Sequence, residues 1–444
     1  MTHLNTQTPI GGDVTQRRDL KPAFSENLFE HVLQRENILN AWQRVRANKG
    51  TAGIDGMTID EFPDWAKSGH WKKVMMDLRT GQYRPSPVKR VEIDKPDGGK
   101  RQLGIPTVID RVIQQAIAQV LTPVFDPGFS SNSFGFRPRR NAQQAVKQVQ
   151  GIIKEGRRIA VDVDLSKFFD RVNHNLLMTH LGYKVKDKHL LKLIKRYLRA
   201  GVIDNQFYSE SREGVPQGGP LSPLLANIML DPLDKELEKR GHRFARYADD
   251  FTILVKSQRA GERVLLSISK YLQNRLKLMV NMTKSQVVKT NESKFLGFTF
   301  RAGRIQWHPK TLLKFKQQVR RLTNRNWGVS MKYQLFKTSQ FIRGWINYFG
   351  IANCYQLCVD LDHWIRRRVR MAYWRQWRKP RTKVRSLMKL GVHVRSAVAC
   401  GITSKGPWRS AKTPGIQQAL SNTFLKSQGL YTLRDGWIKL HHSK

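Results

Sequence analysis

Apolar and polar residues along this 444-residue chain follow two different spacings, and the balance between them changes near residue 308. Before that point, runs with strand-like alternation or hairpin turns are interspersed with runs of helical spacing. The strand-like runs cover residues 88–106, 158–165, 244–255 and 294–306, and the helical runs cover 26–46, 110–124, 141–154, 186–199 and 260–277. Beyond residue 308 only helical spacing continues. The pattern therefore predicts an α+β region followed by an all-helical region.

The run at residues 158–165 is the clearest strand in the chain. Its period-two alternation places Asp162 and Asp164 on one face, together with Ala160. Carboxylates inside such an apolar strand are costly unless cations match them. This strand therefore indicates a metal site.

Two adjacent carboxylates, Asp249 and Asp250, lie where the run at residues 244–255 turns back on itself. Neighbouring aspartates repel each other and prefer water to an apolar setting. An ordinary solvated turn explains such a pair, and so does the tip of a buried hairpin that binds a cation. The pair taken alone does not decide between the two explanations.

The hairpin predicted at residues 88–106 carries basic residues on either side of its tip. Lys95 precedes the turn residues Pro96 to Gly99, and Arg101 follows them. Such a tip can be mere solvated charge. It can also reach the phosphates of a nucleotide, because arginine bonds phosphate oxygens in bidentate fashion.

The net charge of +45 indicates a polyanionic partner, and nucleic acid is the first candidate. An acidic membrane surface is the second, but we find no apolar run near membrane length and no signal-peptide pattern. Residues 301–444 contain 30 Lys and Arg residues against three acidic residues, and eight of the eleven tryptophans. The strongest polyanion binding is therefore expected in the last third. The three cysteines are too few for a disulfide framework or a zinc module, which fits a reducing cytoplasm.

Arginine and tryptophan are interleaved in the helical run from Tyr355 to Trp377. Such a helix can bind phosphates and stack on exposed bases, or it can belong to a bundle with core tryptophans and solvated arginines. For the tryptophans we favour the core. For the arginines, which have few acidic neighbours, we favour RNA contact. The predicted RNA-binding residues are Arg343, Arg366, Arg367, Arg368, Arg370 and Arg375.

The aspartates are stronger evidence for a metal site when they are considered together. Asp164 on one strand and Asp249 and Asp250 on a hairpin could hold two Mg²⁺ ions, each keeping water and phosphate oxygens as further ligands. Two such ions stabilise both the attacking and the leaving oxygen of an in-line displacement. A basic chain with this site is a polymerase or a nuclease.

The order of motifs resembles that of the group II intron reverse transcriptases, which are also called intron-encoded maturases. The matching motifs are Asp55-Gly56 and residues 95–106, 133–138, 164–170, 216–223, 247–250 and 295–298, followed by residues 344–349 and 361–368 in the last third. The resemblance thus covers nearly the whole chain.

This resemblance implies a right-hand polymerase with an antiparallel palm sheet, an α-helical thumb and a small basic C-terminal segment. The expected order is a flexible leader at residues 1–25, fingers and palm at 26–306, a thumb or maturase domain at 307–380, and a DNA-binding segment at 381–444.

The resemblance also assigns roles residue by residue. Asp164 and Asp249 would be metal ligands with Asp250 beside them, and Asp164 is preferred to Asp162 by its distance from Phe169, the aromatic residue that screens the sugar. Lys95 and Arg101 match triphosphate-binding positions and Gln217 matches the nucleotide-pocket glutamine. Lys284 matches a lysine suggested to protonate the leaving pyrophosphate.

The implied partners are an intron RNA template, a DNA primer or target, and dNTPs, with Mg²⁺ as cofactor and no membrane. We expect a bacterial-type cytoplasmic protein, associated with the nucleoid when it acts on DNA, as a monomer or a dimer. The chain lacks the Cys/His nuclease cluster of many relatives, so it resembles the endonuclease-lacking type. Two other readings stay open: a splicing-only maturase, and a related reverse transcriptase recruited for host DNA repair or defence. An RNA-dependent RNA polymerase is disfavoured by Phe169.

Overall fold

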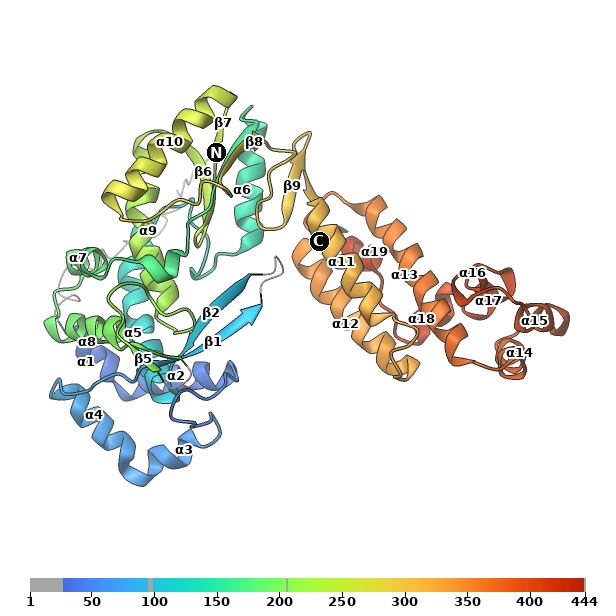
Figure 1. The fold of residues 1–444 in the computed structure, drawn as a ribbon, viewed down its shortest axis with the longest axis horizontal. Helices are drawn as coiled ribbons and strands as arrows, with labels where there is room; N and C mark the ends of the chain where they lie inside the picture. The colour runs from blue at the N-terminus through green and yellow to red at the C-terminus, as the bar shows by residue number, and fades with distance from the viewer. Residues whose placement is uncertain (1–26, 95–98, 205–206, 443–444) are drawn as a thin grey trace, which may run out of the picture. The chain divides into compact units, whose positions relative to one another are not determined.

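A computed structural model describes residues 27–94, 99–204 and 207–442 of the chain. It divides into two compact units: residues 1–128 with 169–229, and residues 129–168 with 230–444 (Figure 1). The four consecutive segments expected from the sequence remain a proposal, and the leader at residues 1–25 lies outside the described residues.

The first unit combines helices with a four-stranded sheet in the order β2-β1-β4-β5. The hairpin predicted at residues 88–106 is present as β1 (Val88–Asp94) and β2 (Lys100–Ile105), and β1 also pairs in parallel with β4 (Val202–Asp204), which pairs with β5 (Phe207–Ser209). Around it lie α1 (Leu28–Leu33), α2 (Arg35–Ala47), α3 (Phe62–Trp65), α4 (Trp71–Arg79), α5 (Val108–Phe125), α7 (His174–Lys184) and α8 (Lys188–Arg199).

Helix α5 forms the centre of this unit. Val112, Ile113 and Ile117 on it are fully buried. At its first turn the buried Asp110 accepts hydrogen bonds from the hydroxyls of Tyr83, at 2.8 Å, and Tyr197, at 3.1 Å. Burial raises the pKa of Asp110, and these neutral donors stabilise a carboxylate that would otherwise be costly in the core.

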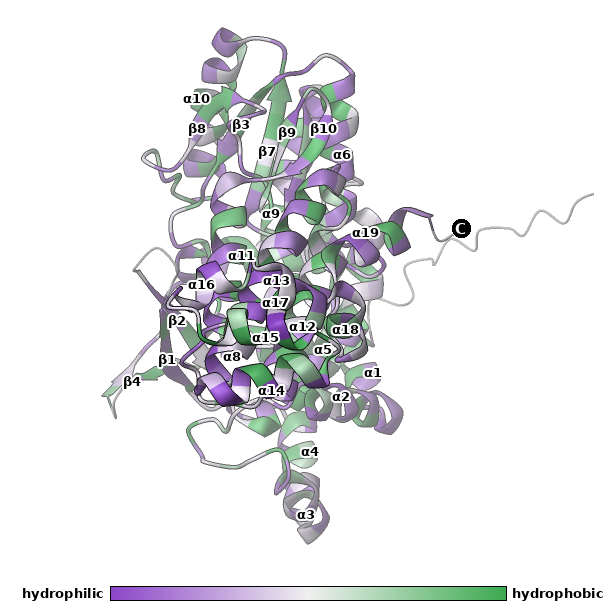
Figure 2. Ribbon diagram, turned by 90° about the vertical axis from the view of Figure 1, so that its right-hand side faces the viewer, coloured by the Kyte–Doolittle hydropathy of each residue, from purple (hydrophilic) through white to green (hydrophobic). Residues whose placement is uncertain are grey.

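The second unit contains the predicted antiparallel palm sheet, in the order β6-β7-β3-β8. Its strands are β6 (Arg243–Tyr247), β7 (Asp250–Val255), β3 (Ile159–Val163) and β8 (Gln286–Lys289), with α6 (Ala142–Lys154) and α10 (Gln258–Arg275) packed against it. In Figure 2, β7 is coloured as strongly hydrophobic, as expected for a strand with neighbours on both sides. Gly261 of α10 packs on Ile159 and Val161, so α10 covers the face opposite the aspartates.

The all-helical region predicted beyond residue 308 is confirmed, after a hairpin of β9 (Phe298–Arg301) and β10 (Arg304–Trp307). Its long helices are α11 (Pro309–Leu322), α12 (Met331–Phe349) and α13 (Tyr355–Gln376). Shorter helices follow: α14 (Pro380–Lys389), α15 (Val394–Gly401), α16 (Pro407–Ser410), α17 (Pro414–Ala419), α18 (Asn422–Ser427) and α19 (Leu433–His442). Helix α9 (Ser222–Lys239) runs from the first unit into the second.

Tryptophans pack into the core of the helical region, as the sequence predicts for the tryptophans of the long helix. Trp374 is 1% exposed, and Trp307 packs edge-on against Trp345 with ring centroids 5.8 Å apart. None of the described helices is long and apolar enough to cross a lipid bilayer.

Candidate active site

The turn between β6 and β7 presents the adjacent aspartates. Tyr247 pairs with Asp250, so only Ala248 and Asp249 form the loop. Ala248 has a φ of 58°, in the left-handed region that non-glycine residues rarely adopt. A positive φ at the first loop residue is the geometry of a two-residue type II′ hairpin, which matches the twist of paired strands.

The segment that carries Gly135 packs directly onto this turn. Phe134 N–H donates to the Arg246 carbonyl, and Arg246 N–H donates to the Asn132 carbonyl, each at 2.9 Å. A Cβ on Gly135 would lie 2.2 Å from the backbone nitrogen of Ala248. A glycine is therefore required here by the close approach of two backbones.

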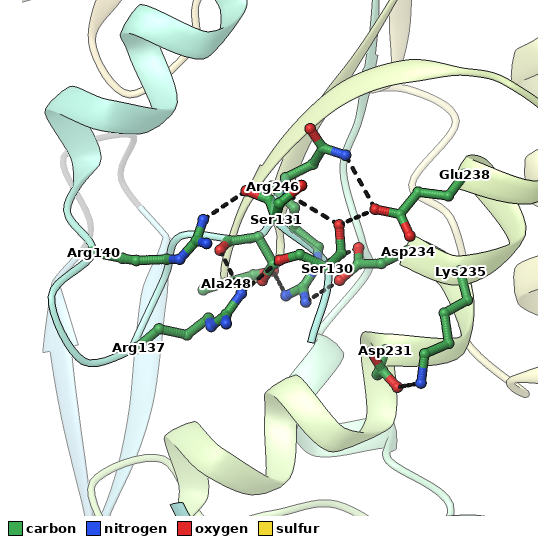
Figure 3. Close-up of polar contacts among 12 residues, drawn as sticks. Ser130, Ser131, Arg137, Arg140, Asp231, Asp234, Lys235, Glu238, Arg246 and Ala248 are labelled. Atoms are coloured by element: carbon green, nitrogen blue, oxygen red, sulfur yellow. Dashed lines mark hydrogen bonds and ion pairs between the residues drawn. The ribbon is translucent and has the colours of Figure 1, made fainter. Parts of the chain in front are cut away.

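The side chain of Arg246 fixes the same turn (Figure 3). Its Nε and Nη2 donate to the two carboxylate oxygens of Asp234 on α9, at 2.7 and 2.5 Å, and its Nη1 donates to the Ala248 carbonyl at 2.9 Å. Both charged side chains are fully buried. A bidentate ion pair therefore joins α9 to the loop that carries Asp249.

Sheet register decides which carboxylates share a face. Asp162 pairs with Thr252 and Val163 pairs with Phe251 across β3 and β7. Because side chains alternate along a strand, Asp162 and Asp164 lie on the same face as Thr252 and Asp250. Asp250 is thus the strand neighbour of Asp164, while Asp249 occupies the loop itself.

The carboxylate of Asp250 lies in a concentrated negative field. The residue keeps exposed surface, although the neighbouring strands crowd its carboxylate. Burial, followed by the charges of Asp162, Asp249 and Asp164, raises its pKa to about 7. Four carboxylates therefore act on one another in this corner of the sheet.

Asp162 on β3 and Asp164, which directly follows the strand, have different surroundings. Asp162 accepts hydrogen bonds from Thr252 Oγ1 (2.8 Å), Ser293 Oγ (3.1 Å) and Gln286 Nε2 (3.3 Å). Asp164 is exposed, and we find no hydrogen bond to its carboxylate within the described residues. The protein thus satisfies Asp162 internally and leaves Asp164 open to a ligand.

The loop of Lys284 is tied to Asp164 through the backbone. Asn281 N–H donates to the Asp164 carbonyl at 2.8 Å, and Ser285 Oγ accepts from the Asp164 N–H at 3.0 Å. The structure therefore brings the exposed Lys284 segment to the strand end that carries Asp164.

The predicted nucleotide-binding residues of the first unit form a second group. Gly104 N–H donates to the Gln217 carbonyl at 2.7 Å, which places Gln217 against β2, the strand of Arg101. Val215 N–H donates to the Phe169 carbonyl at 2.6 Å. Backbone bonds thus connect the segments of Arg101, Gln217 and Phe169, and Lys95 lies outside the described residues.

The predicted RNA-binding arginines of α13 make internal contacts. Arg367 stacks 3.7 Å from the Trp408 ring centroid and donates to the Trp408 carbonyl. Arg368 donates to Thr323 Oγ1 at 2.6 Å, and Arg370 donates to the Leu420 carbonyl at 2.9 Å. These three side chains join α13 to neighbouring segments of the helical region, a structural role that the sequence did not indicate.

The remaining predicted RNA-binding residues are placed differently. Arg343 lies over the Tyr431 ring, 5.0 Å from its centroid, and Arg366 and Arg375 line two separate cavities. Their contact with RNA remains a prediction.

Within the described residues, no three or more His, Cys, Asp or Glu side chains form a group that could hold a metal ion as the structure stands. The chemistry of the donors nevertheless fits Mg²⁺, because oxygen ligands with room for water and phosphate are what this ion prefers. The carboxylates that repel one another around Asp250 also supply the negative charge that would attract such a cation.

The sequence reasoning missed Arg246, Asp234 and the network around Asp162. Arg246 did leave a signal, because it interrupts an otherwise apolar strand and a charge there requires a partner. Asp234 on α9 left no comparable signal.

Comparison with known proteins identifies the family. Residues 93–300 match the family of reverse transcriptases (RNA-dependent DNA polymerases), and residues 312–391 match the group II intron maturase-specific domain. Protein YkfC of Escherichia coli (strain K12) is 31% identical over 322 residues, which cover 63% of this chain and 83% of YkfC.

The group II intron-encoded protein LtrA of Lactococcus lactis subsp. cremoris is 29% identical over 345 residues, covering 62% of this chain and 57% of LtrA. The solved partial Cas6-RT-Cas1–Cas2 complex matches with a TM-score of 0.37 and 28% identity, over 57% of this chain and 43% of that one. The two family matches and the similarity to LtrA confirm the resemblance seen in the motifs. The chain belongs to the group II intron reverse transcriptases, in which an RNA-directed DNA polymerase domain is followed by a maturase domain.

Proposed function

We propose that this protein copies RNA into DNA by two-metal-ion nucleotidyl transfer and binds its intron RNA to assist splicing and mobility. The observation that carries the proposal is the carboxylate cluster of the palm sheet. Asp164 and Asp250 share a face at neighbouring strand ends, and Asp249 occupies the rigid loop between β6 and β7.

Asp164, Asp249 and Asp250 would hold two Mg²⁺ ions, with Asp249 as a direct ligand and Asp250 as the supporting charge. Register adds that Asp250 is the nearer strand neighbour of Asp164. When bound, the ions would stabilise charge on the attacking and leaving oxygens of the phosphoryl group. The protein's own contribution is the fixed loop: Arg246 and Gly135 hold Ala248 in place, so the carboxylates need little rearrangement during the reaction.

The other predicted residues bind and select the nucleotide. Lys95 and Arg101 would bind the triphosphate, Gln217 would contact the nucleotide, and the ring of Phe169 would exclude a ribose 2′-hydroxyl. Lys284, which lies on the loop bonded to Asp164, would donate a proton to the leaving pyrophosphate.

Assistance of splicing is supported by the maturase-specific match at residues 312–391 and by the basic helical region. We propose that residues 26–306 are fingers and palm, 307–380 the thumb, and 381–444 a DNA-binding segment. The partners would be intron RNA, a DNA primer or target, and dNTPs, in the cytoplasm and at the nucleoid.

Primer extension on an RNA template with dNTPs or ribonucleotides in parallel tests the proposal. We expect extension with dNTPs to be strongly preferred over extension with ribonucleotides, and it should require a divalent cation. Extension that prefers ribonucleotides would overturn the assignment. Location of the gene inside a folded group II intron RNA would favour the intron role over a role in host repair or defence.

A further inference from the structure

The loop between α11 and α12 and the C-terminal end of α13 border an open cavity of about 440 Å³. Hydrogen bonds fix its walls: Gln376 Nε2 donates to the Val329 carbonyl at 2.8 Å, and Gln334 Nε2 donates to the Asn324 carbonyl at 3.1 Å. The cavity is therefore formed before any ligand binds.

The described side chains that line the cavity carry positive charge that no acidic side chain among them offsets. Arg325, Arg375 and Arg378 line the cavity, and no acidic residue is among the described residues that line it. The acidic residues of α13 are engaged elsewhere: Asp362 accepts from the backbone of α19, and Asp360 accepts from Gln356. Three guanidinium groups around one preformed cavity match phosphate oxygens, which they can bond in bidentate fashion.

An exposed aromatic strip adjoins the cavity. Trp327 at its edge is 37% exposed, Tyr333 is 45% exposed and Phe336 is 58% exposed. The Trp327 and Tyr333 ring centroids lie 5.9 Å apart. The Lys337 ammonium lies over the rings of Tyr333 and Phe336, at 5.6 and 5.8 Å.

This combination decides what kind of partner fits. A purely apolar strip would suit a protein surface, whereas large aromatic rings interleaved with cations are typical of surfaces that stack bases and bind phosphates. A base offers its face to a protein ring where it does not stack on its neighbours in a helix, so a single strand fits this surface better than a duplex.

We propose that this cavity and strip bind a single-stranded segment of nucleic acid, with successive phosphodiesters on Arg325, Arg375 and Arg378 and unpaired bases stacked on Trp327 and Tyr333. The site rests on the proposed function, because a polymerase that binds intron RNA would supply such a segment. RNA and DNA strands share this chemistry, and the experiment separates them.

The test measures binding of fluorescein-labelled oligonucleotides by the full chain, in EDTA and without nucleotides, so that catalysis plays no part. The probes are a single-stranded RNA 20-mer, the DNA strand of the same sequence, and the corresponding duplex. Arg375→Gln/Arg378→Gln should weaken single-strand binding about tenfold and reduce the salt slope by about 1.4, for two lost phosphate contacts. Trp327→Ala should weaken it about tenfold and Trp327→Phe should restore it, because both rings can stack.

Arg259→Gln/Arg263→Gln, on the exposed surface of α10, is the control that removes the same charge. It should weaken binding less than threefold. A loss confined to the RNA or the DNA probe supports the site and identifies its strand. An equal loss in the control, or an equal loss for the duplex, would overturn the proposal. The wild-type chain could fail in primer extension while the cavity variants still lose single-strand binding. That result would support this site and contradict the proposed function.

Discussion

Arg246 and Asp234 form a fully buried bidentate ion pair, and the remaining guanidinium nitrogen of Arg246 donates to the Ala248 carbonyl in the aspartate turn. The pair joins helix α9 to the residue that directly precedes Asp249. Its consequences for stability and for activity can be measured separately.

We predict that Asp234→Asn lowers the free energy of unfolding by about 3–5 kcal/mol, because it leaves a buried guanidinium without its counter-charge. Primer extension should also fall, since Arg246 no longer orients the turn. Urea unfolding and single-turnover extension measure the two effects. The exposed pair Arg243–Glu155 offers the control: Glu155→Gln should cost less than about 1 kcal/mol. Equal costs for the two variants would contradict the role of burial.

Gly135→Ala should damage the active site although it adds only one methyl group. The new Cβ would lie 2.2 Å from the Ala248 nitrogen, so the turn must move. We expect a cost of about 1–3 kcal/mol in stability and a clear loss of primer extension.

Gly344→Ala is the matched control, because a Cβ there meets no atom within 4 Å and the residue lies inside α12. That variant should be neutral or stabilising by about 0.5–1 kcal/mol. Full activity of Gly135→Ala would show that the turn tolerates displacement.

Asp164→Asn and Asp249→Asn should each reduce primer extension by about a hundredfold or more, the scale on which loss of one transition-state-stabilising group acts. The reduction should come with a raised Mg²⁺ requirement and with little change in primer–template affinity. Asp360→Asn, an exposed site on α13, controls for the lost charge. Unaltered extension by either active-site variant would remove that residue from the proposed metal site.

Phe169→Val should shift the sugar preference of the polymerase. If the ring excludes the 2′-hydroxyl, ribonucleotide incorporation relative to deoxynucleotide incorporation should rise about tenfold or more, the scale on which apolar contacts discriminate substrates. The ratio of kcat/KM values for the two nucleotides measures it. Phe207→Val, at a residue that is 81% exposed, should leave the ratio unchanged. A constant ratio in Phe169→Val would assign selectivity to another residue.

The stability of the helical region should depend on pH through Asp362, which lies 3% exposed beneath the start of α19. Burial raises its pKa to about 6 from an ordinary value of 3.8. The folded state therefore holds this proton more tightly than the unfolded state. The stabilisation that the bound proton gives the fold is present at low pH and is lost as pH rises from about 4 to 6.

The loss corresponds to about 3 kcal/mol. Urea unfolding at several pH values should show the wild type losing stability of this order relative to Asp362→Asn over that range, because the asparagine does not titrate. A difference that stays constant with pH would mean that Asp362 titrates normally in the fold.

The local sequence patterns of the chain were sufficient to predict its secondary-structure elements and its family. Alternation with a period of two predicts β3 and places Asp162 and Asp164 on one face, and the paired strands confirm this. The β1–β2 hairpin and the all-helical last third follow from turn residues and helical spacing in the same way. These features depend on residues close in sequence, which is why one sequence reveals them.

Tertiary structure decided which of these residues have partners within the protein. Asp162 is satisfied by Thr252, Ser293 and Gln286, which come from segments at least 90 positions away. Arg367 and Arg370 bond to backbone carbonyls, which every residue carries and no sequence pattern marks. Alternation and charge counts show where a polar group lies along the chain, but only the packing of distant segments brings it the donor or acceptor that determines its role.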